Sequence, residues 1–293
     1  LALLCILLGR ITLGFAESWV ATAVIVWNIR RVGAAHTAKV ISWNGVCSYG
    51  GIAIGAPIAT LLYQSGSTVL TGFSGVGLLC AALMLLGVLL AFKQPSVAPL
   101  PSTQPVSFIQ TLGKVWPFGT ALAAGSIGFG AISALLTLYF SDRHWPGAAL
   151  ALALFGTLFV LTRFGFTRQI MHHGGLVVAF VSLLIEAVGL TVLAYAPTAF
   201  WACIGAACAG AGFSLLFPAL GVGAVARVGP ENRGAAIGAF CVFLDIAIGV
   251  SGPLLGLIIP LWGYGPLFLV TALCAVMGMG VCWALNVKSR NAN

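Results

Sequence analysis

The stretch that decides the fold runs from Gly9 to Pro57 and reads GRITLGFAESWVATAVIVWNIRRVGAAHTAKVISWNGVCSYGGIAIGAP. It contains two apolar runs, each long enough for a membrane-spanning helix, separated by a short basic loop. The first run carries Arg10, Gly14 and Glu17, and the second ends in a glycine-rich segment broken by Pro57. Charge inside hydrocarbon is costly and small residues let helices pack closely in lipid, so both features need an explanation beyond filling a membrane.

The composition predicts an all-α membrane protein. Hydrophobic residues make up 60% of the 293-residue chain, charged residues only 6%, and the mean hydropathy is +1.11. Soluble globular proteins carry about 25% charged residues, so we expect a chain that crosses the lipid bilayer several times. Nine apolar runs are long enough to span it, at residues 1–28, 40–64, 69–92, 115–140, 148–168, 176–196, 200–226, 234–260 and 266–287.

The formal net charge of +8 is spread over the loops, which argues against a nucleic-acid partner. If successive loops alternate between the two sides of the membrane, eleven basic residues fall on one side: Arg30, Arg31, Lys39, Lys93, Lys114, Arg163, Arg168, Arg227, Arg233, Lys288 and Arg290. The other side receives Arg143. Because basic loops stay on the cytoplasmic side, we expect a multi-pass protein of a bacterial inner membrane with a cytoplasmic C-terminus.

The longest polar segment lies at residues 93–114 and contains four prolines, which disfavour a helix. It is predicted to be a cytoplasmic linker between a bundle at residues 1–92 and a six-span bundle at residues 115–293. Nine spans with a cytoplasmic end place the first residue outside, and Leu1 already lies inside an apolar run. We therefore expect the natural protein to begin before Leu1.

The chain also aligns with itself without gaps at one offset. Gly14 falls on Gly210 and Pro57 on Pro253, and 253 − 57 = 196. Equal helix direction in the two copies predicts a parallel repeat, whose halves are related by an axis along the membrane normal. Spans one and two then correspond to spans seven and eight, so the first half would lack three spans.

Three segments carry a resemblance to a known family: Ile41-Ser42-Trp43-Asn44-Gly45, Gly55-Ala56-Pro57 and Gly212-Phe213-Ser214-Leu215-Leu216-Phe217-Pro218-Ala219-Leu220-Gly221. The whole chain resembles helices four to twelve of a major facilitator superfamily carrier, and its amino-acid sequence is similar to that of YhhS-type bacterial carriers. The resemblance implies two pseudo-symmetric helical bundles that rock around a central cavity, with nine of twelve helices present.

The resemblance also implies roles for particular residues. An arginine followed four residues later by glycine marks helix four of the superfamily, as Arg10 and Gly14 do here. A glycine- and proline-rich segment in helix five, associated with proton antiporters, is matched in part, because Thr60 stands where a further glycine is common. The second-half counterpart of the family's loop motif corresponds to a cytoplasmic loop with Arg163 and Arg168.

Arg10, Gly14 and Glu17 lie at positions i, i+4 and i+7, so they share one helix face, with Arg10 and Glu17 about 10.5 Å apart. This face should look into the bundle, because charge at mid-depth in lipid costs at least ~2.5 kcal/mol. The arginine would then steer an anionic group or a carboxylate's proton, or would simply bind carbonyls of a neighbouring helix. The repeat partners Ala206 and Phe213 are apolar, so the scaffold itself does not demand the charged pair.

Two more carboxylates lie deep in predicted spans. Asp245 precedes glycines that share its face, and it is predicted either to handle protons or substrate or to make a polar contact between helices. Glu186 is equally deep, on a helix that the resemblance makes peripheral. Close helix packing or gating is expected at the remaining small residues and prolines: Gly14, Gly51, Gly55, Pro57, Gly249, Gly252 and Pro253.

No enzymatic or cofactor motif is supported. The segment Gly249-Val250-Ser251-Gly252 resembles the G-x-S-G of rhomboid-type proteases, but no histidine base occurs in any predicted span. Glycine-rich segments at residues 128–130 and 210–212 follow no strand and lack a lysine, so they predict helix packing. The eight cysteines fall in predicted helices without C-x-x-C spacing, and we expect no metal.

The sequence therefore predicts a secondary active transporter driven by an ion gradient, since it carries no nucleotide-binding motif. We expect proton antiport that exports a small molecule, with Arg10, Glu17, Asp245 and Glu186 as substrate- or proton-coupling candidates, acting as a monomer. Two alternatives stay open at this point. One is uptake or facilitated diffusion of a small organic anion bound by Arg10, and the other is a membrane sensor or scaffold without turnover.

Overall fold

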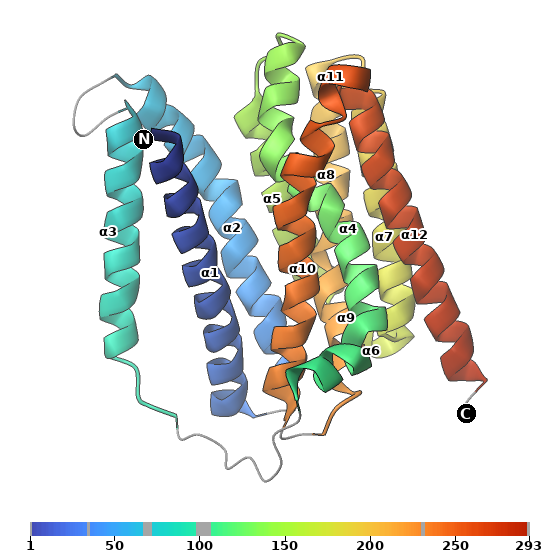
Figure 1. The fold of residues 1–293 in the computed structure, drawn as a ribbon. Coiled ribbons are helices and arrows are strands. Elements are labelled where there is room, and N and C mark those ends of the chain that lie inside the picture. The colour runs from blue at the N-terminus through green and yellow to red at the C-terminus, as the bar shows by residue number, and fades with distance from the viewer. Residues whose placement is uncertain (1, 34–35, 67–71, 98–106, 230–231, 292–293) are drawn as a thin grey trace.

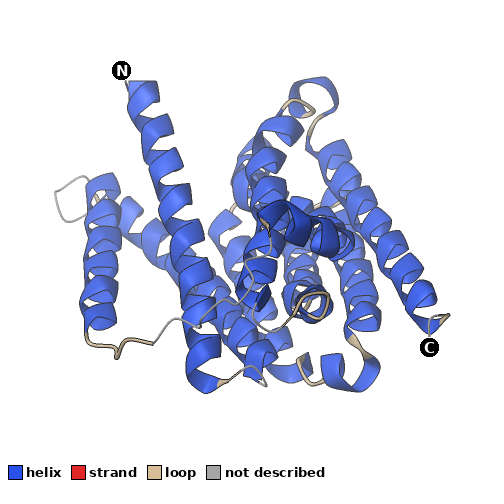
Figure 2. Cartoon of the chain, turned by 60° about the horizontal axis from the view of Figure 1, so that its bottom comes forward, coloured by secondary structure: helices blue, strands red, loops and turns tan. Residues whose placement is uncertain are grey.

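The computed structural model describes residues 2–33, 36–66, 72–97, 107–229 and 232–291. Every element in this described part is a helix (Figure 2). Nine segments of the described chain are long and apolar enough to cross a membrane, which confirms the predicted fold class. The absence of strands follows from the apolar surroundings, where each backbone group needs a partner within its own segment.

The helices form two groups in Figure 1, and the groups are in contact through α2 and α5. The first bundle contains α1 (Ala2–Val32), α2 (Thr37–Gln64) and α3 (Gly72–Phe92). The second bundle contains α4 (Phe108–Asp142), α5 (Ala148–Phe166), α7 (Gly175–Ala194), α8 (Ala199–Ser214), α9 (Leu216–Val225), α10 (Arg233–Gly256) and α12 (Tyr264–Arg290). Two short helices, α6 (Gln169–His173) and α11 (Ile259–Trp262), connect neighbours within it.

The seventh predicted span is broken into α8 and α9 at Leu215. The cause is Pro218, which has no backbone N–H and cannot donate to the carbonyl of Ser214 four residues earlier. The chain keeps its direction across the break, so the span still crosses the membrane. The break leaves the Ser214 carbonyl free for another donor.

The internal repeat has a structural counterpart. Helix α2 begins at Thr37 and α10 begins at Arg233, and 233 − 37 = 196, the offset of the sequence alignment. Pro57 lies inside α2 and Pro253 lies inside α10. Both helices start at the lower end of the molecule in Figure 1, as a parallel repeat requires.

We call that lower end the basic end. Helices α1, α3, α5, α9 and α12 finish there, and it carries Arg30, Arg31, Arg168, Arg227 and Lys288. The two bundles meet at this end through four buried aliphatic side chains: Ile25 of α1, Ile41 of α2, Val225 of α9 and Ile237 of α10. Toward the other end α2 leans away from α5 (Figure 1). The bundles are therefore docked at the basic end.

The second bundle is held together by close helix contacts at glycines. A Cβ atom at Gly205 of α8 would stand 2.8 Å from the carbonyl oxygen of Gly189 on α7, a distance that leaves no room for a side chain. Small residues at such crossings let two backbones touch, which is the main source of helix association in lipid. The α7–α8 contact should therefore tolerate no larger residue.

Replacing Gly189 by alanine should destabilise the protein by about 1–3 kcal/mol, because the new methyl group overpacks this contact. The matched control is Gly249→Ala, where no described atom lies within 4 Å of the new Cβ atom. Alanine also has a higher helix propensity than glycine, so this variant should not be destabilised. The unfolding midpoint of each variant is measured on the purified full-length protein by heating samples and monitoring the loss of folded protein by size-exclusion chromatography. Equal midpoints for the two variants would contradict the packing described here.

Candidate functional site

Arg163 joins the two bundles at the basic end. We expected it in a cytoplasmic loop, but the structure places it inside α5 with only 2% of its surface exposed. Its Nη2 donates to the carbonyl of Ser214 on α8, and its Nη1 donates to the carbonyl of Ile41 on α2 at 3.4 Å. The guanidinium also lies 4.8 Å from the centre of the Phe159 ring. A buried cation is tolerated here because carbonyl oxygens and an aromatic face surround it.

Helix α2 is shaped to receive this guanidinium. A Cβ atom at Gly45 would stand 2.7 Å from Arg163 Nη1, so glycine leaves the space that the cation fills. Beside it, the hydroxyl oxygens of Ser42 and Thr167 lie 3.2 Å apart and link α2 to the residue that follows α5. This part of α2 is the segment Ile41–Gly45, one of the three that carry the family resemblance. The sequence alone did not connect this segment with Arg163.

One turn further along α2, the Tyr49 ring enters the second bundle. Its ring centre lies 3.6 Å from that of Phe159, 5.2 Å from Phe129, 5.8 Å from Phe213 and 6.5 Å from Phe155. We call these four phenylalanines the aromatic cage. They come from α4, α5 and α8, so they meet only in the folded bundle. No signal in the sequence identified Tyr49 as their partner.

A second link between the bundles lies midway along the helices. The Ser18 hydroxyl of α1 donates to Asp245 Oδ2 of α10 at 3.3 Å. Glu17 is within Coulombic reach of Asp245, and both carboxylates are exposed. The structure thus brings together two of the predicted site residues from different bundles. Arg10 lies in α1, but its side chain is outside the described part of the structure.

Glu186 does not belong to this pair. It lies in the middle of α7, inside the second bundle, with 1% of its surface exposed. Its Oε2 atom has no hydrogen-bond partner among the described residues. The three predicted carboxylates therefore divide between the bundle interface and the interior of the second bundle.

The predicted packing glycines differ in their surroundings. At Gly14, Gly51, Gly55 and Gly249, no described atom lies within 4 Å of the position that a Cβ atom would take. Gly252 has an ordinary contact with the Cβ atom of Ala134 at 3.5 Å. The tight approach of α2 occurs at Gly45 instead, so a packing or gating role for the other glycines and the two prolines stays a prediction. Arg168 is exposed at the start of α6.

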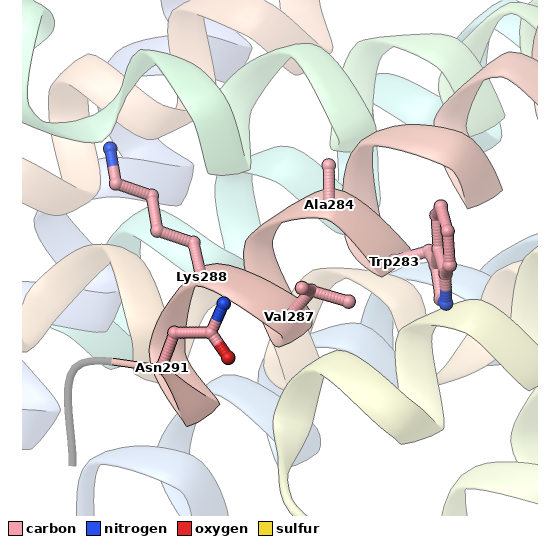
Figure 3. Close-up of a pocket in the computed structure, with 5 residues that line it drawn as sticks. All are labelled: Trp283, Ala284, Val287, Lys288 and Asn291. Atoms are coloured by element: carbon pink, nitrogen blue, oxygen red, sulfur yellow. The ribbon is translucent and has the colours of Figure 1, made fainter.

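Two pockets lie outside the bundle interface. Figure 3 shows the residues that line one of about 570 Å³, which come from the end of α12 and the residue after it: Trp283, Ala284, Val287, Lys288 and Asn291. A single helix gives it no opposing wall, and tryptophan beside lysine is typical of a membrane–water boundary. The other, of about 530 Å³, is lined by Val24, Asn28, Val32, His36, Lys39, Val40, Trp43, Asn44 and Cys47 of the first bundle. Neither contains the predicted carboxylates.

These features define a polytopic helical membrane protein with two bundles docked at one end. A family model described as the Major Facilitator Superfamily matches residues 2–173. An uncharacterized MFS-type transporter of Burkholderia mallei (strain SAVP1) is 45% identical over 277 residues, which cover 94% of this chain and 67% of that protein. Another, of Pseudomonas aeruginosa (strain UCBPP-PA14), is 44% identical over 292 residues, covering 99% and 71%. The chain belongs to the Major Facilitator Superfamily of transporters.

Solved structures share the fold at low sequence identity. The Escherichia coli fucose:proton symporter FucP superimposes with a TM-score of 0.63 at 17% identity, over 91% of this chain and 72% of FucP. The human organic anion transporter MFSD10 has a TM-score of 0.65 at 14% identity, over 84% of this chain and 63% of that protein. Members of this superfamily are carriers rather than enzymes, in agreement with the sequence prediction.

Replacing Arg163 by alanine should weaken the docking of the bundles by about 1–3 kcal/mol, because the charged hydrogen bond from α5 to the Ile41 carbonyl of α2 is lost. The readout is the disulfide yield between Ser42→Cys and Thr167→Cys, introduced in the full-length protein after its native cysteines are replaced. The yield should fall in the Arg163→Ala background. Arg168→Ala, an exposed arginine at the same end, is the matched control and should leave it unchanged; a fall in both or in neither would refute the link.

Proposed function

We propose that the protein exports a small molecule across the bacterial inner membrane by proton antiport, with its basic end in the cytoplasm. The carrier would work by rocking of the two bundles, so that docking at one end alternates with docking at the other. In the described conformation the basic end is closed, so the path between the bundles would be open to the outside. Assignment to the YhhS-type carriers and a monomeric state remain part of this proposal.

The observation that supports proton coupling is the hydrogen bond from Ser18 to Asp245. It crosses between the bundles at mid-height, and Glu17 adds a second carboxylate beside it. A carboxylate at this position can exchange a proton with water in the path between the bundles. The same change in charge can make or break its hydrogen bond with Ser18 on the other bundle. Protonation of Asp245 would therefore alter a contact that the rocking motion must break.

The two carboxylates also bear on the substrate. Exposed negative charges between the bundles favour a cationic or neutral compound over an anionic one, because carboxylates attract a cation and repel an anion. FucP is a fucose:proton symporter and MFSD10 is an organic anion transporter, so this fold can carry neutral sugars as well as organic anions. For this chain we favour an organic cation as the exported compound.

Proton movement in everted membrane vesicles that contain the full-length protein tests antiport. Adding ethidium or another organic cation to acidified vesicles should release protons, reported by recovery of a pH-sensitive dye. Asp245→Asn should reduce this release to the level of vesicles without the protein, because the amide cannot carry a proton. Asp142→Asn, at the exposed end of α4, is the control and should retain it. Ethidium flux with an unchanged pH signal would exclude proton antiport.

A further inference from the structure

We propose that Glu186 is a proton-binding site inside the second bundle, and that Tyr49 of the first bundle closes it when the bundles dock at the basic end. The inference rests on the proton coupling proposed above, but it concerns a different residue and a different place in the fold. It follows from the way in which α4, α7 and α8 surround one carboxyl group.

Two glycines of α4 make the space that the Glu186 carboxyl fills, and a glycine of α8 lies against its backbone. A Cβ atom at Gly128 of α4 would stand 2.7 Å from Oε1, and one at Gly125 would stand 2.9 Å from Oε2. On the other side, a Cβ atom at Gly212 of α8 would stand 2.7 Å from the Cα atom of Glu186. The two glycines of α4 therefore give this carboxyl its room, and Gly212 lets α8 approach the backbone of Glu186, while Oε2 has no hydrogen-bond partner among the described residues. An ionised carboxylate without a partner is costly in an apolar interior, and a bound proton removes that charge.

Two of the glycines that contact Glu186 are followed directly in the sequence by a phenylalanine of the aromatic cage. Gly128 precedes Phe129 on α4, and Gly212 precedes Phe213 on α8. Successive residues of a helix point about 100° apart, so the glycine can face Glu186 while its neighbour faces the bundle interface. The two phenylalanine rings stack on each other with centres 5.2 Å apart. In the proposed site this stacked pair separates the carboxyl from Tyr49 of α2.

Tyr49 covers the other side of this stacked pair. Its ring lies edge-on to both Phe129 and Phe213, and its hydroxyl is within Coulombic reach of Glu186 and Arg163. The backbone of α2 is also fixed there, because a Cβ atom at Gly156 of α5 would stand 2.8 Å from the Tyr49 carbonyl oxygen. When α2 moves away from α5, Tyr49 must leave the cage. Its departure would uncover Phe129 and Phe213 and so open a route to the carboxyl.

Among the described residues, the neighbours placed against Glu186 from the helices packed on α7 are uncharged. They are Gly125 and Gly128 from α4 and Gly212 from α8, while Leu216 of α9 contacts Gly125. Helix α12 packs one turn away, where a Cβ atom at Gly278 would stand 3.2 Å from a methyl carbon of Leu183. Tyr49 is the titratable side chain that packs against Phe129 and Phe213. Uptake of one proton from water on the open side neutralises Glu186, and its release restores the carboxylate.

Infrared spectroscopy of the full-length protein in lipid vesicles tests the proposal without a transported compound, using the proton and deuterium as probes. A protonated carboxylic acid has a carbonyl stretching band that shifts when its proton exchanges for deuterium. We expect a slowly exchanging acid band that disappears in Glu186→Gln. In Tyr49→Ala the same band should exchange about tenfold faster or more, because the site is no longer covered.

Two variants separate the cover from general loss of structure. Tyr49→Phe keeps the ring and should exchange as slowly as the unmodified protein, and Tyr63→Ala removes an exposed tyrosine of the same helix and should do likewise. Gly128→Ala should shift the frequency of the acid band, since its methyl group would touch the carboxyl. An acid band that survives Glu186→Gln, or equal exchange in Tyr49→Ala and Tyr63→Ala, would overturn the proposal. Because ethidium plays no part, failure of antiport in vesicles is a separate outcome.

Discussion

The docking of the two bundles depends on a carbonyl group that a proline leaves without its usual donor. Pro218 cannot donate to Ser214, and inside a membrane no water can replace the missing hydrogen bond. Arg163 supplies it, and the same guanidinium also reaches the carbonyl of Ile41 on α2. A local break in one bundle is thus compensated by a residue that holds the other bundle in place.

The face of α2 that meets the second bundle follows from this contact. Ile41, Gly45, Tyr49 and Ala53 lie four residues apart, so they form one stripe along the helix. Gly45 admits the guanidinium, Tyr49 fills the aromatic cage, and the backbone at Ala53 touches α5 beside Gly156. The stripe runs from the basic end to mid-height, where Ser18 and Asp245 form the other link. A rocking motion would have to break this series of contacts in order.

The general architecture could be predicted from the sequence because apolar length and charge distribution report directly on the membrane. The nine spans and the repeat offset agree with the helices of the structure. The contacts could not be predicted, because they join residues far apart in the chain. Arg163 was expected in a loop because the resemblance matched it to the family's loop motif. Its partners are carbonyl groups, which any residue supplies, so no sequence pattern identifies them. Glu186 was expected on a peripheral helix from the family resemblance, and the glycines of α4 and α8 that surround it could not be assigned to it from the sequence.

The central claim is that docking at the basic end and at the opposite end exclude each other. Spin-label distances in lipid nanodiscs test it most directly, with one pair at Lys39 and Arg227 near the basic end and another at Leu61 and Leu257 near the opposite end. Changing the pH should produce a second population in which the first distance is longer and the second is shorter. Distances that lengthen together, or that show one unchanged population at every pH, would contradict the account.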